Sequence, residues 1–395
     1  MKQPGKLLRS ISNKRIEPAA AMLKQIIKAE YELEKLLPQS RLQSRPPTEL
    51  LSAALKWSEL VWQGAEKLGT MHLTPTQIAH GLALRRRPVF ICGVHRSGTT
   101  LVQNLLDNHP QLSVLPSEGT YYTNQLLKLK QLPPSQRAKY LGTEWLRRMV
   151  NPINQQPYWL LGRSDEGGSR YVDFARYVLA WWDILPHTEN TQWPHLAIVL
   201  AYASCANNLT ALSWVDKTPT NERFLHRIWV EFPDAKIVHV VRNPVATLTS
   251  RKVMEPDIRL RNALRHLRLS YRVATDKATT NDPRFFLLRY EYLCDTPDVI
   301  LPQLAGFLNI DLSPSLYQPT TGGMNTHANS SFKTDASHGA ILKTNSHSQQ
   351  EVFTSADKKL IAAYVGKEAA LLGYPVDKIN SFDKLYAHLR YALFN

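Results

Sequence analysis

The sequence has little cysteine and no long apolar run. It contains three cysteines in 395 residues, Cys92, Cys205 and Cys294, which are widely spaced and lie in apolar surroundings. This usage predicts reduced core thiols in a cytoplasmic protein and argues against a disulfide framework. No stretch reaches the roughly 18 consecutive apolar residues that a membrane span needs. The basic N-terminal segment has no apolar stretch behind it, so neither a membrane span nor a signal peptide is predicted.

Acidic residues are also scarce. The chain has 33 Asp and Glu against 48 Lys and Arg, which gives a formal net charge of +15. Such an excess of positive charge is consistent with binding to nucleic acid, to an anionic membrane surface or to a small polyanionic ligand. Because the basic residues are spread along the chain, a phosphate-handling enzyme fits at least as well as a nucleic-acid groove. Hydrolase motifs are missing too, since the sequence contains no zinc-ligand spacing, no HExxH helix and no GxSxG elbow.

Helical spacing of apolar residues dominates the first 84 positions, and Thr74-Pro75 is typical of the start of a short helix. We therefore expect a helical N-terminal extension over residues 1–84 and an α/β domain over residues 85–395. Within that domain, an aromatic-rich helical insertion is expected at about 125–210, where the aromatic residues either pack the insertion or line an acceptor pocket. Residues 320–350 are rich in Ser, Thr, Asn, His and Gly and predict a mobile loop.

Three short apolar runs predict buried strands, at residues 89–92, 236–241 and 285–288. The first run ends in glycine and is followed by a helical pattern up to residue 106. The second is followed by Asn243-Pro244, a typical N-cap and first helical residue. Strands that alternate with helices in this way predict a P-loop α/β fold, a parallel sheet flanked by helices.

The turn after the first predicted strand reads GVHRSGTT, residues 93–100. Its two glycines allow successive backbone N–H groups to point at one anion, and the helix that follows adds a partial positive charge. The spacing matches the nucleotide-triphosphate loop GxxxxGK[ST], but Thr99 stands where the lysine would be, so a γ-phosphate would lose its usual countercharge. Arg96 supplies a cation earlier in the loop. The loop therefore suits a 5'-phosphate that carries one further small anionic group.

Residues 93–101, together with the segment LDNHP at 106–110, resemble the 5'-phosphosulfate loop of sulfotransferases that depend on 3'-phosphoadenosine 5'-phosphosulfate (PAPS). Within that family, the resemblance is nearest to the tyrosylprotein sulfotransferases and the related bacterial proteins. It implies that the loop binds the 5'-phosphosulfate of PAPS through backbone amides, a cation and hydroxyl groups, which here belong to Arg96, Ser97, Gly98, Thr99 and Thr100.

A second motif follows the second predicted strand, where Arg242 precedes Asn243-Pro244 and Ser250 lies eight residues further on. An arginine at a strand end and a serine on the next helix can converge on one phosphate. The alternative is that Arg242 caps a helix or pairs with a carboxylate. The arrangement resembles the family's 3'-phosphate site. Because ATP has no 3'-phosphate, the two motifs together argue against an enzyme that uses ATP or GTP.

Sulfuryl transfer needs a base for the acceptor's proton and a cation near the leaving oxygen. The position of Glu118 resembles that of the family's catalytic glutamate, and Lys217, in the phrase KTPTN, resembles the lysine that stabilises the departing phosphate. His95 is a rival base, because its ordinary pKa suits the role. The alternatives are a solvent-facing loop carboxylate for Glu118 and a surface lysine for Lys217.

Towards the C-terminus the resemblance weakens. In the family a serine and a basic residue cover the nucleotide, which implies Ser331 and, on a weaker match, Lys343. The predicted function is transfer of a sulfuryl group from PAPS to a hydroxyl or amine of a saccharide, lipid, peptide or small-molecule acceptor, with no metal and no nucleic-acid partner. The alternatives are a P-loop nucleotide kinase and a non-catalytic polyanion-binding protein.

Overall fold

The computed structural model describes residues 20–36, 48–150, 159–162, 170–185, 193–206, 208–325, 340–341, 352–375 and 377–393. The chain divides into two compact units. The first comprises Met1–Arg85 and Asn124–Leu209, and the second comprises Arg86–Thr123 and Thr210–Asn395. The N-terminal helices thus fold into the same unit as the segment that starts at residue 124.

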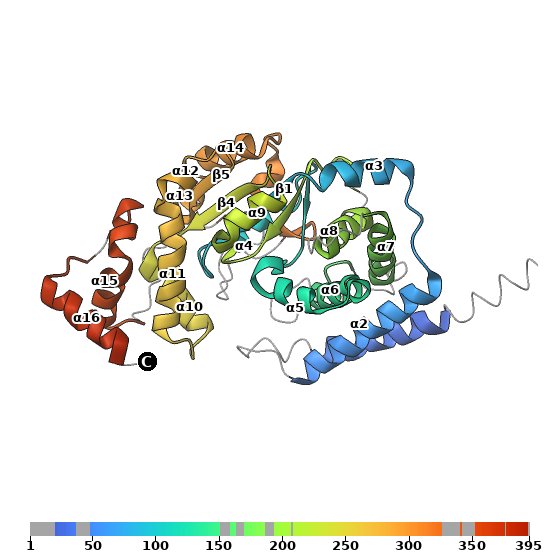
Figure 1. Cartoon of the computed structure of the whole chain (residues 1–395), viewed down its shortest axis with the longest axis horizontal. Coiled ribbons are helices and arrows are strands. Elements are labelled where there is room, and N and C mark those ends of the chain that lie inside the picture. Colours follow the sequence, from blue (N-terminus) through green and yellow to red (C-terminus); the bar gives the residue numbers. More distant parts are fainter. Residues whose placement is uncertain are drawn as a thin grey trace, which may run out of the picture. The chain divides into compact units, whose positions relative to one another are not determined.

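The described part of the first unit is helical, apart from an isolated bridge between Val150 and Trp159. Its α3 begins where Thr74-Pro75 predicts, because Thr74 and Gln77 form a reciprocal capping box. Figure 1 shows α6, α7 and α8 beside one another in this unit, and α2 packs on both α6 and α7. The helices are one over residues 20–36, α2 (Thr48–Leu68), α3 (Pro75–Leu84), α5 (Leu126–Gln131), α6 (Pro134–Met149), α7 (Arg170–Ile184) and α8 (Trp193–Ala206).

Aromatic side chains form much of the core of this helical unit. Trp57 on α2 makes edge-to-face contacts with Trp159 and Tyr171, at ring-centre distances of 5.7 and 5.0 Å. These three side chains are buried, as are Phe174 and Trp181 on α7. Such contacts stabilise a core beyond the area they bury. For these residues of the predicted insertion, packing rather than an acceptor pocket is the observed role.

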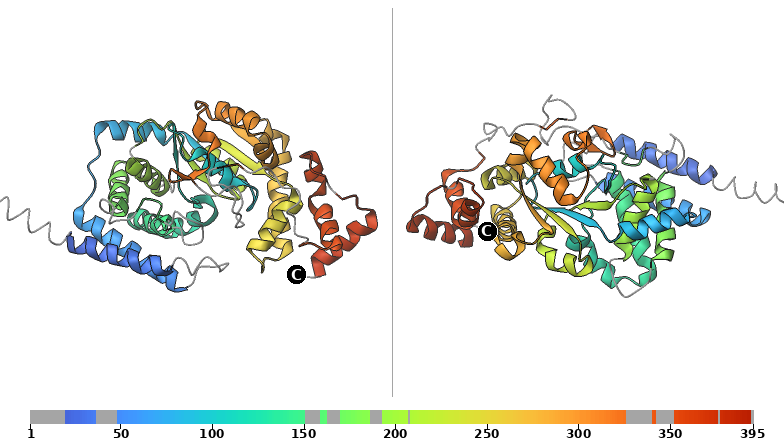
Figure 2. Two further views of the ribbon diagram at one scale, coloured as in Figure 1. Left: turned by 180° about the vertical axis from the view of Figure 1, so that it is seen from behind. Right: turned by 90° about the horizontal axis from the view of Figure 1, so that it is seen from above.

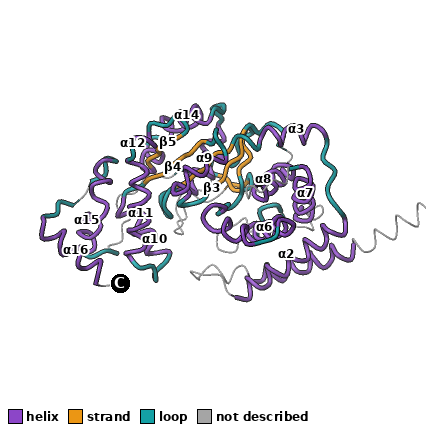
Figure 3. The backbone as a smooth tube through the Cα atoms, in the orientation of Figure 1, coloured by secondary structure: helices purple, strands orange, loops and turns teal. Residues whose placement is uncertain are grey.

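The second unit is built on a five-stranded sheet in the order β2-β3-β1-β4-β5. Every neighbouring pair is parallel, and Figure 3 shows the strands in orange. The three predicted strands are present as β1, β4 and β5, and the predicted α/β fold is confirmed. In chain order the strands are β1 (Pro88–Cys92), β2 (Leu112–Val114), β3 (Ser213–Lys217), β4 (Lys236–Val241) and β5 (Phe285–Arg289).

Helices cover both faces of this sheet (Figure 2). Val89, Ile91 and Val238 point to one face, where they pack with α4, α13 and α14. A second cluster joins the end of β4 to α10, α11 and α15. The helices are α4 (Thr99–Leu106), α9 (Leu225–Glu231), α10 (Pro244–Met254), α11 (Leu260–Thr275), α12 (Lys277–Thr280), α13 (Tyr290–Asp295), α14 (Pro297–Leu308), α15 (Ser355–Leu371) and α16 (Ser381–Leu393).

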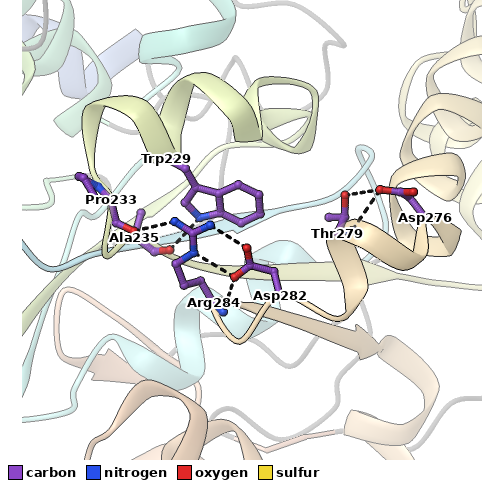
Figure 4. A network of polar contacts seen from close by, with 7 residues as sticks. All are labelled: Trp229, Pro233, Ala235, Asp276, Thr279, Asp282 and Arg284. Carbon is purple, nitrogen blue, oxygen red and sulfur yellow. Dashed lines mark hydrogen bonds and ion pairs between the residues drawn. The ribbon is translucent and has the colours of Figure 1, made fainter.

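At the amino ends of the strands, one arginine ties together the segments that enter β4 and β5 (Figure 4). Arg284 donates hydrogen bonds to both carboxylate oxygens of Asp282, at 2.9 and 2.6 Å, and to the Pro233 carbonyl at 2.7 Å. Its guanidinium also lies 4.4 Å from the ring centre of Trp229, whose indole N–H donates to the Ala235 carbonyl. A bidentate, stacked arginine has a well-defined geometry. This network therefore stabilises the amino ends of β4 and β5, which lie at the end of the sheet opposite the predicted site.

The carboxyl ends of all five strands lie at one edge, because the sheet is parallel. β1 lies in the middle of the sheet. The next two strands along the chain, β2 and β3, lie on one side of β1, and the last two, β4 and β5, lie on the other side. In open α/β sheets, ligands bind outside the carboxyl ends of the strands where the strand order reverses. This rule points to the loop after β1.

The described helices and the cysteines bear on membrane spans and disulfides. None of these helices has the length and apolar character that crossing a bilayer requires. All three cysteines are free thiols, as predicted, with Cys92 and Cys294 buried and Cys205 half-buried.

Candidate active site

The loop after β1 is pressed against two other parts of the second unit. Gly93 and Gly98 have positive φ angles of 140° and 104°. A Cβ on Gly93 would lie 2.3 Å from the carbonyl oxygen of Val240, and one on Gly98 would lie 2.2 Å from the ring of Tyr290. Only glycine meets both demands, the backbone conformation and the close approach. The loop is thereby held at the ends of β4 and β5.

The other loop residues differ in exposure. Ser97 is fully buried, and its hydroxyl has no hydrogen-bond partner among the described residues. Thr99 is buried and Thr100 is exposed, in the first turn of α4. Gly98 is the N-cap of this helix and offers no side chain to its first N–H groups. Such N–H groups are donors that an anion can satisfy.

Arg96 reaches from this loop to α10. It has a φ of 73°, in the left-handed region that a residue with a side chain adopts only when its surroundings hold it there. In this conformation the Arg96 Nε donates to the Ser250 hydroxyl at 3.1 Å. The loop after β1 and the second motif are thus in direct contact, although 154 positions separate the two residues.

Arg242 lies beside this contact. Its Nη1 donates to the Arg96 carbonyl at 3.3 Å, and its guanidinium lies 4.5 Å from the ring centre of Tyr290. Burial and the positive charge of Arg242 lower the pKa of Arg96. Two guanidinium groups and a hydroxyl at one place form an arrangement that a phosphate would stabilise. The structure therefore brings Arg96, Arg242 and Ser250 together.

Local contacts keep the second motif in place. Asn243 caps α10, as predicted, by accepting a hydrogen bond from the Ala246 N–H at 3.1 Å. Its own N–H donates to the Glu291 carboxylate at 2.8 Å. The Tyr271 hydroxyl donates to the Arg242 carbonyl. The backbone of Arg242 is therefore held from α11 and α13, which leaves its side chain to point at the loop.

Glu118 and Lys217 also meet. Glu118 follows β2 and Lys217 ends β3, and the Lys217 Nζ lies 2.7 Å from the Glu118 Oε1. Their side chains are 38% and 6% exposed, so Lys217 is not a surface lysine. His95 is close to the pair, because the charges of both residues act on it. Burial lowers the pKa of His95, and the nearby Glu118 opposes that shift. Both candidate bases are thus on the same side of the loop.

Sequence reasoning missed the carboxylate that supports this turn. Asp216, fully buried in β3, accepts hydrogen bonds from the Gly119 N–H and the Thr218 hydroxyl, each at 3.0 Å. The Thr218 hydroxyl in turn accepts from the Thr120 N–H at 2.9 Å. Burial raises the pKa of Asp216 to about 6. These bonds determine the path of the chain at Glu118. The available signal was an aspartate directly after the apolar residues Trp214 and Val215.

A second buried carboxylate, which the sequence analysis also missed, contacts the loop after β1. Glu222 lies in a short 3₁₀ helix after β3 (Asn221–Phe224) and is 2% exposed. Its Oε2 accepts a hydrogen bond from the Gly93 N–H at 3.0 Å. Burial raises its pKa to about 7. In the sequence, Glu222 stands among polar residues, and nothing there indicates its burial.

The variant Glu222→Gln is expected to change how stability depends on pH. A pKa of about 7 in the fold, against an ordinary 4.5, means that the folded protein holds the proton more tightly. The resulting stability is full below about pH 4.5 and is lost as pH rises through 7. Glutamine keeps an acceptor for Gly93 and cannot ionise. From pH 5 to 8, the wild type should therefore lose about 3 kcal/mol of unfolding free energy relative to the variant, measured by urea unfolding. A difference that does not vary with pH would contradict this.

Ser331 and Lys343 lie outside the described residues, as does most of the predicted mobile loop, of which only residues 320–325, 340 and 341 are described. Within the described ranges, no group of three or more His, Cys, Asp or Glu side chains is placed to hold a metal ion.

The parallel sheet flanked by helices and the glycine loop after β1 define a P-loop-like α/β fold. A family model described as "Sulfotransferase family" matches residues 88–314, more than half of the chain. The chain belongs to the sulfotransferase family. It is therefore an enzyme that transfers a sulfuryl group to an acceptor, as predicted, and the PAPS-dependent class named from the sequence is confirmed over the kinase and polyanion-binding alternatives.

Solved structures similar to this chain include the sulfotransferase domain of the Synechococcus PCC 7002 olefin synthase, which is 17% identical, covers 78% of this chain and 94% of that chain, and has a TM-score of 0.36. Sulfotransferase STF1 of Mycobacterium tuberculosis H37Rv is 16% identical over 76% and 90%, with a TM-score of 0.37. Retinol dehydratase, in a complex with retinol and PAP, is 16% identical over 83% and 87%, with a TM-score of 0.32. These low scores carry no part of the assignment. No curated protein sequence matches this chain.

Proposed function

We propose that PAPS binds along the carboxyl edge of the sheet, with its 5'-phosphosulfate in the loop at 93–100 and its 3'-phosphate at Arg242 and Ser250. The observation that supports this most is the convergence of Arg96, Arg242 and Ser250 from two distant segments. The N–H groups at the start of α4 then serve the 5' end of the donor, with the hydroxyls of Ser97, Thr99 and Thr100. The Arg96 guanidinium, which touches Ser250, adds positive charge between the two phosphates.

For the chemistry, we propose Glu118 as the base and Lys217 as the cation at the leaving group. Glu118 takes the proton from the acceptor's hydroxyl or amine, and the freed electron pair attacks the sulfur. The bond between sulfur and the bridging oxygen breaks, and the electrons stay on the 5'-phosphate, whose new negative charge Lys217 stabilises. The products are the sulfated acceptor and 3'-phosphoadenosine 5'-phosphate (PAP), with the proton on Glu118. The contact of 2.7 Å between the two side chains supports a shared reaction centre.

Transfer of labelled sulfuryl from PAPS to saccharide, lipid, peptide and small-molecule acceptors tests the proposal and identifies the acceptor. Labelled product is expected with at least one acceptor class, and the Glu118 and Lys217 variants described below should not form it at the parent rate. Protein that binds PAP but forms no labelled product with any class would contradict the proposed reaction centre.

Replacing Arg242 with alanine should weaken the binding of PAP by about ten- to a hundred-fold. A charge-assisted hydrogen bond to a phosphate is worth on the order of 1.5–3 kcal/mol, which corresponds to this change in affinity. Titration calorimetry with PAP measures the effect. Arg268→Ala is the matched control, because that arginine lies on α11 and faces Glu368; it should bind PAP like the wild type. Near-normal affinity in Arg242→Ala would mean that Arg242 is a structural residue.

A further inference from the structure

Arg251, the residue after Ser250 on α10, is a buried cation with unused donors. Its side chain is 9% exposed. Its Nε and Nη1 are buried and have no hydrogen-bond partner in the part of the chain that the structure describes. The ion pair that Arg251 forms is long, with 3.6 Å between its Nη2 and the half-exposed Glu255 carboxylate. Burying a guanidinium without partners is costly, so an anion that reaches these nitrogens would be bound favourably.

His266, on the neighbouring helix α11, shows the same feature. Its Nδ1 is buried and has no hydrogen-bond partner among the described residues. Burial lowers the pKa of His266, and the positive charges nearby lower it further, in decreasing order those of Arg251, Arg223, His95 and Arg265. Two unsatisfied polar side chains, one from α10 and one from α11, therefore lie close to the phosphate loop.

Arg96 and His95, which are neighbours in the loop after β1, indicate whether Arg251 lies on the donor side or the acceptor side of that loop. The Arg96 side chain extends to Ser250 and stands beside Arg242, the proposed donor anchors. The charges that act on His95 are those of Glu118, Arg251, Glu255 and Lys217. Arg251 thus shares its surroundings with the proposed reaction centre, where an acceptor must lie for its oxygen or nitrogen to reach the sulfur.

We propose that Arg251 and His266 form a binding site for an anionic group of the acceptor, a carboxylate, a sulfate ester or a phosphate ester. The proposal rests on the proposed function, because Glu118 and Lys217 locate the acceptor side. The anion would accept hydrogen bonds from Arg251 Nε and Nη1, and Glu255 would keep its contact with Nη2. The net charge of +15 would draw an anionic acceptor to the enzyme.

The test uses inorganic sulfate as the probe on protein saturated with PAP, so that the donor site is occupied. Melting temperature is followed against sulfate concentration, with sodium chloride keeping the ionic strength constant. Bound sulfate stabilises the fold according to its affinity. The wild type should show a saturable rise that chloride does not produce. In Arg251→Gln the apparent sulfate affinity should fall at least tenfold. Arg272→Gln, which removes the same charge from an exposed position near the end of α11, where Arg272 faces Glu368, should respond like the wild type.

The same samples separate this proposal from the donor site. Without sulfate, Arg251→Gln should melt no lower than the wild type, because it removes a poorly paired buried charge, and it should bind PAP with wild-type affinity. A sulfate response that is absent in the wild type, or unchanged in Arg251→Gln, overturns the anion site. A loss of PAP affinity as large as in Arg242→Ala would assign Arg251 to the donor and also overturn it. Failure of the wild type to bind PAP contradicts the donor site instead.

Discussion

The Glu118→Gln enzyme is expected to transfer sulfuryl groups about two to four powers of ten more slowly than the parent. That is the range for removal of a general base. Glutamine keeps the size of the side chain and an oxygen that accepts from Lys217, which lies 2.7 Å from Glu118 in the parent. It cannot take the acceptor's proton. Affinity for PAP should be nearly unchanged, because Glu118 takes no part in the proposed donor contacts. Initial rates, PAP calorimetry and melting temperature on this one variant measure the three quantities.

The matched control for this prediction is Glu368→Gln, on α15. That glutamate faces Arg268 and Arg272, and its variant should transfer at close to the parent rate. A structural role for Glu118 would show itself differently, as a lower melting temperature and weaker binding with little specific loss of rate. A Glu118→Gln enzyme with the parent rate would transfer the role of base to His95 or to another residue.

Lys217→Met should lower the rate by about a hundred- to a thousand-fold, which is typical for the loss of one group that stabilises charge in the transition state. The negative charge on the leaving phosphate oxygen grows during the reaction, so the rate should fall more than the affinity for PAP. Methionine fills a similar volume in this site, where the lysine side chain is 6% exposed. Single-turnover rates with labelled PAPS, compared with PAP affinity, measure the difference.

Lys236→Met is the control for Lys217, because Lys236 is also a strand lysine but begins β4, at the opposite edge of the sheet, beside Phe307. It should keep the parent rate. Equal losses of rate in the two variants, or a loss in Lys217→Met that is explained by a lower melting temperature, would contradict a role at the leaving group.

The parts of the fold that could be predicted from the sequence are those that short stretches of neighbouring residues determine. The apolar runs of β1, β4 and β5, the glycines around the loop, and the helix starts at Thr74-Pro75 and Asn243-Pro244 each depend on neighbouring residues only. β2 has three residues, too few for a periodic pattern, and its place at the edge of the sheet depends on pairing with β3, about a hundred residues later. The described helices before residue 85 and those after residue 124 form one unit, which likewise depends on contacts between distant segments that no local pattern encodes.

In the candidate site too, the features that depend on neighbouring residues were predicted, and those that depend on contacts between distant segments were not. Motif spacing located Arg96, Arg242 and Ser250, but the direct bond from Arg96 to Ser250 depends on a left-handed backbone at Arg96 and on the packing of α10 against the loop. Asp216 and Glu222 were missed because a carboxylate in a sequence is normally exposed. Their burial and their bonds to Gly119 and Gly93 arise only when β1 and β3 come together.

In the proposed binding mode, two groups of residues, one after β1 and one after β4, bind the two phosphate ends of a single nucleotide. Titration calorimetry of the wild-type protein with PAP and with adenosine 5'-phosphate tests this binding mode, because the two ligands differ only in the 3'-phosphate. We expect PAP to bind about ten- to a hundred-fold more tightly than adenosine 5'-phosphate. This is the change in affinity that a charge-assisted contact from Arg242 or Ser250 to the 3'-phosphate would give. Equal affinity for the two nucleotides would contradict the claim.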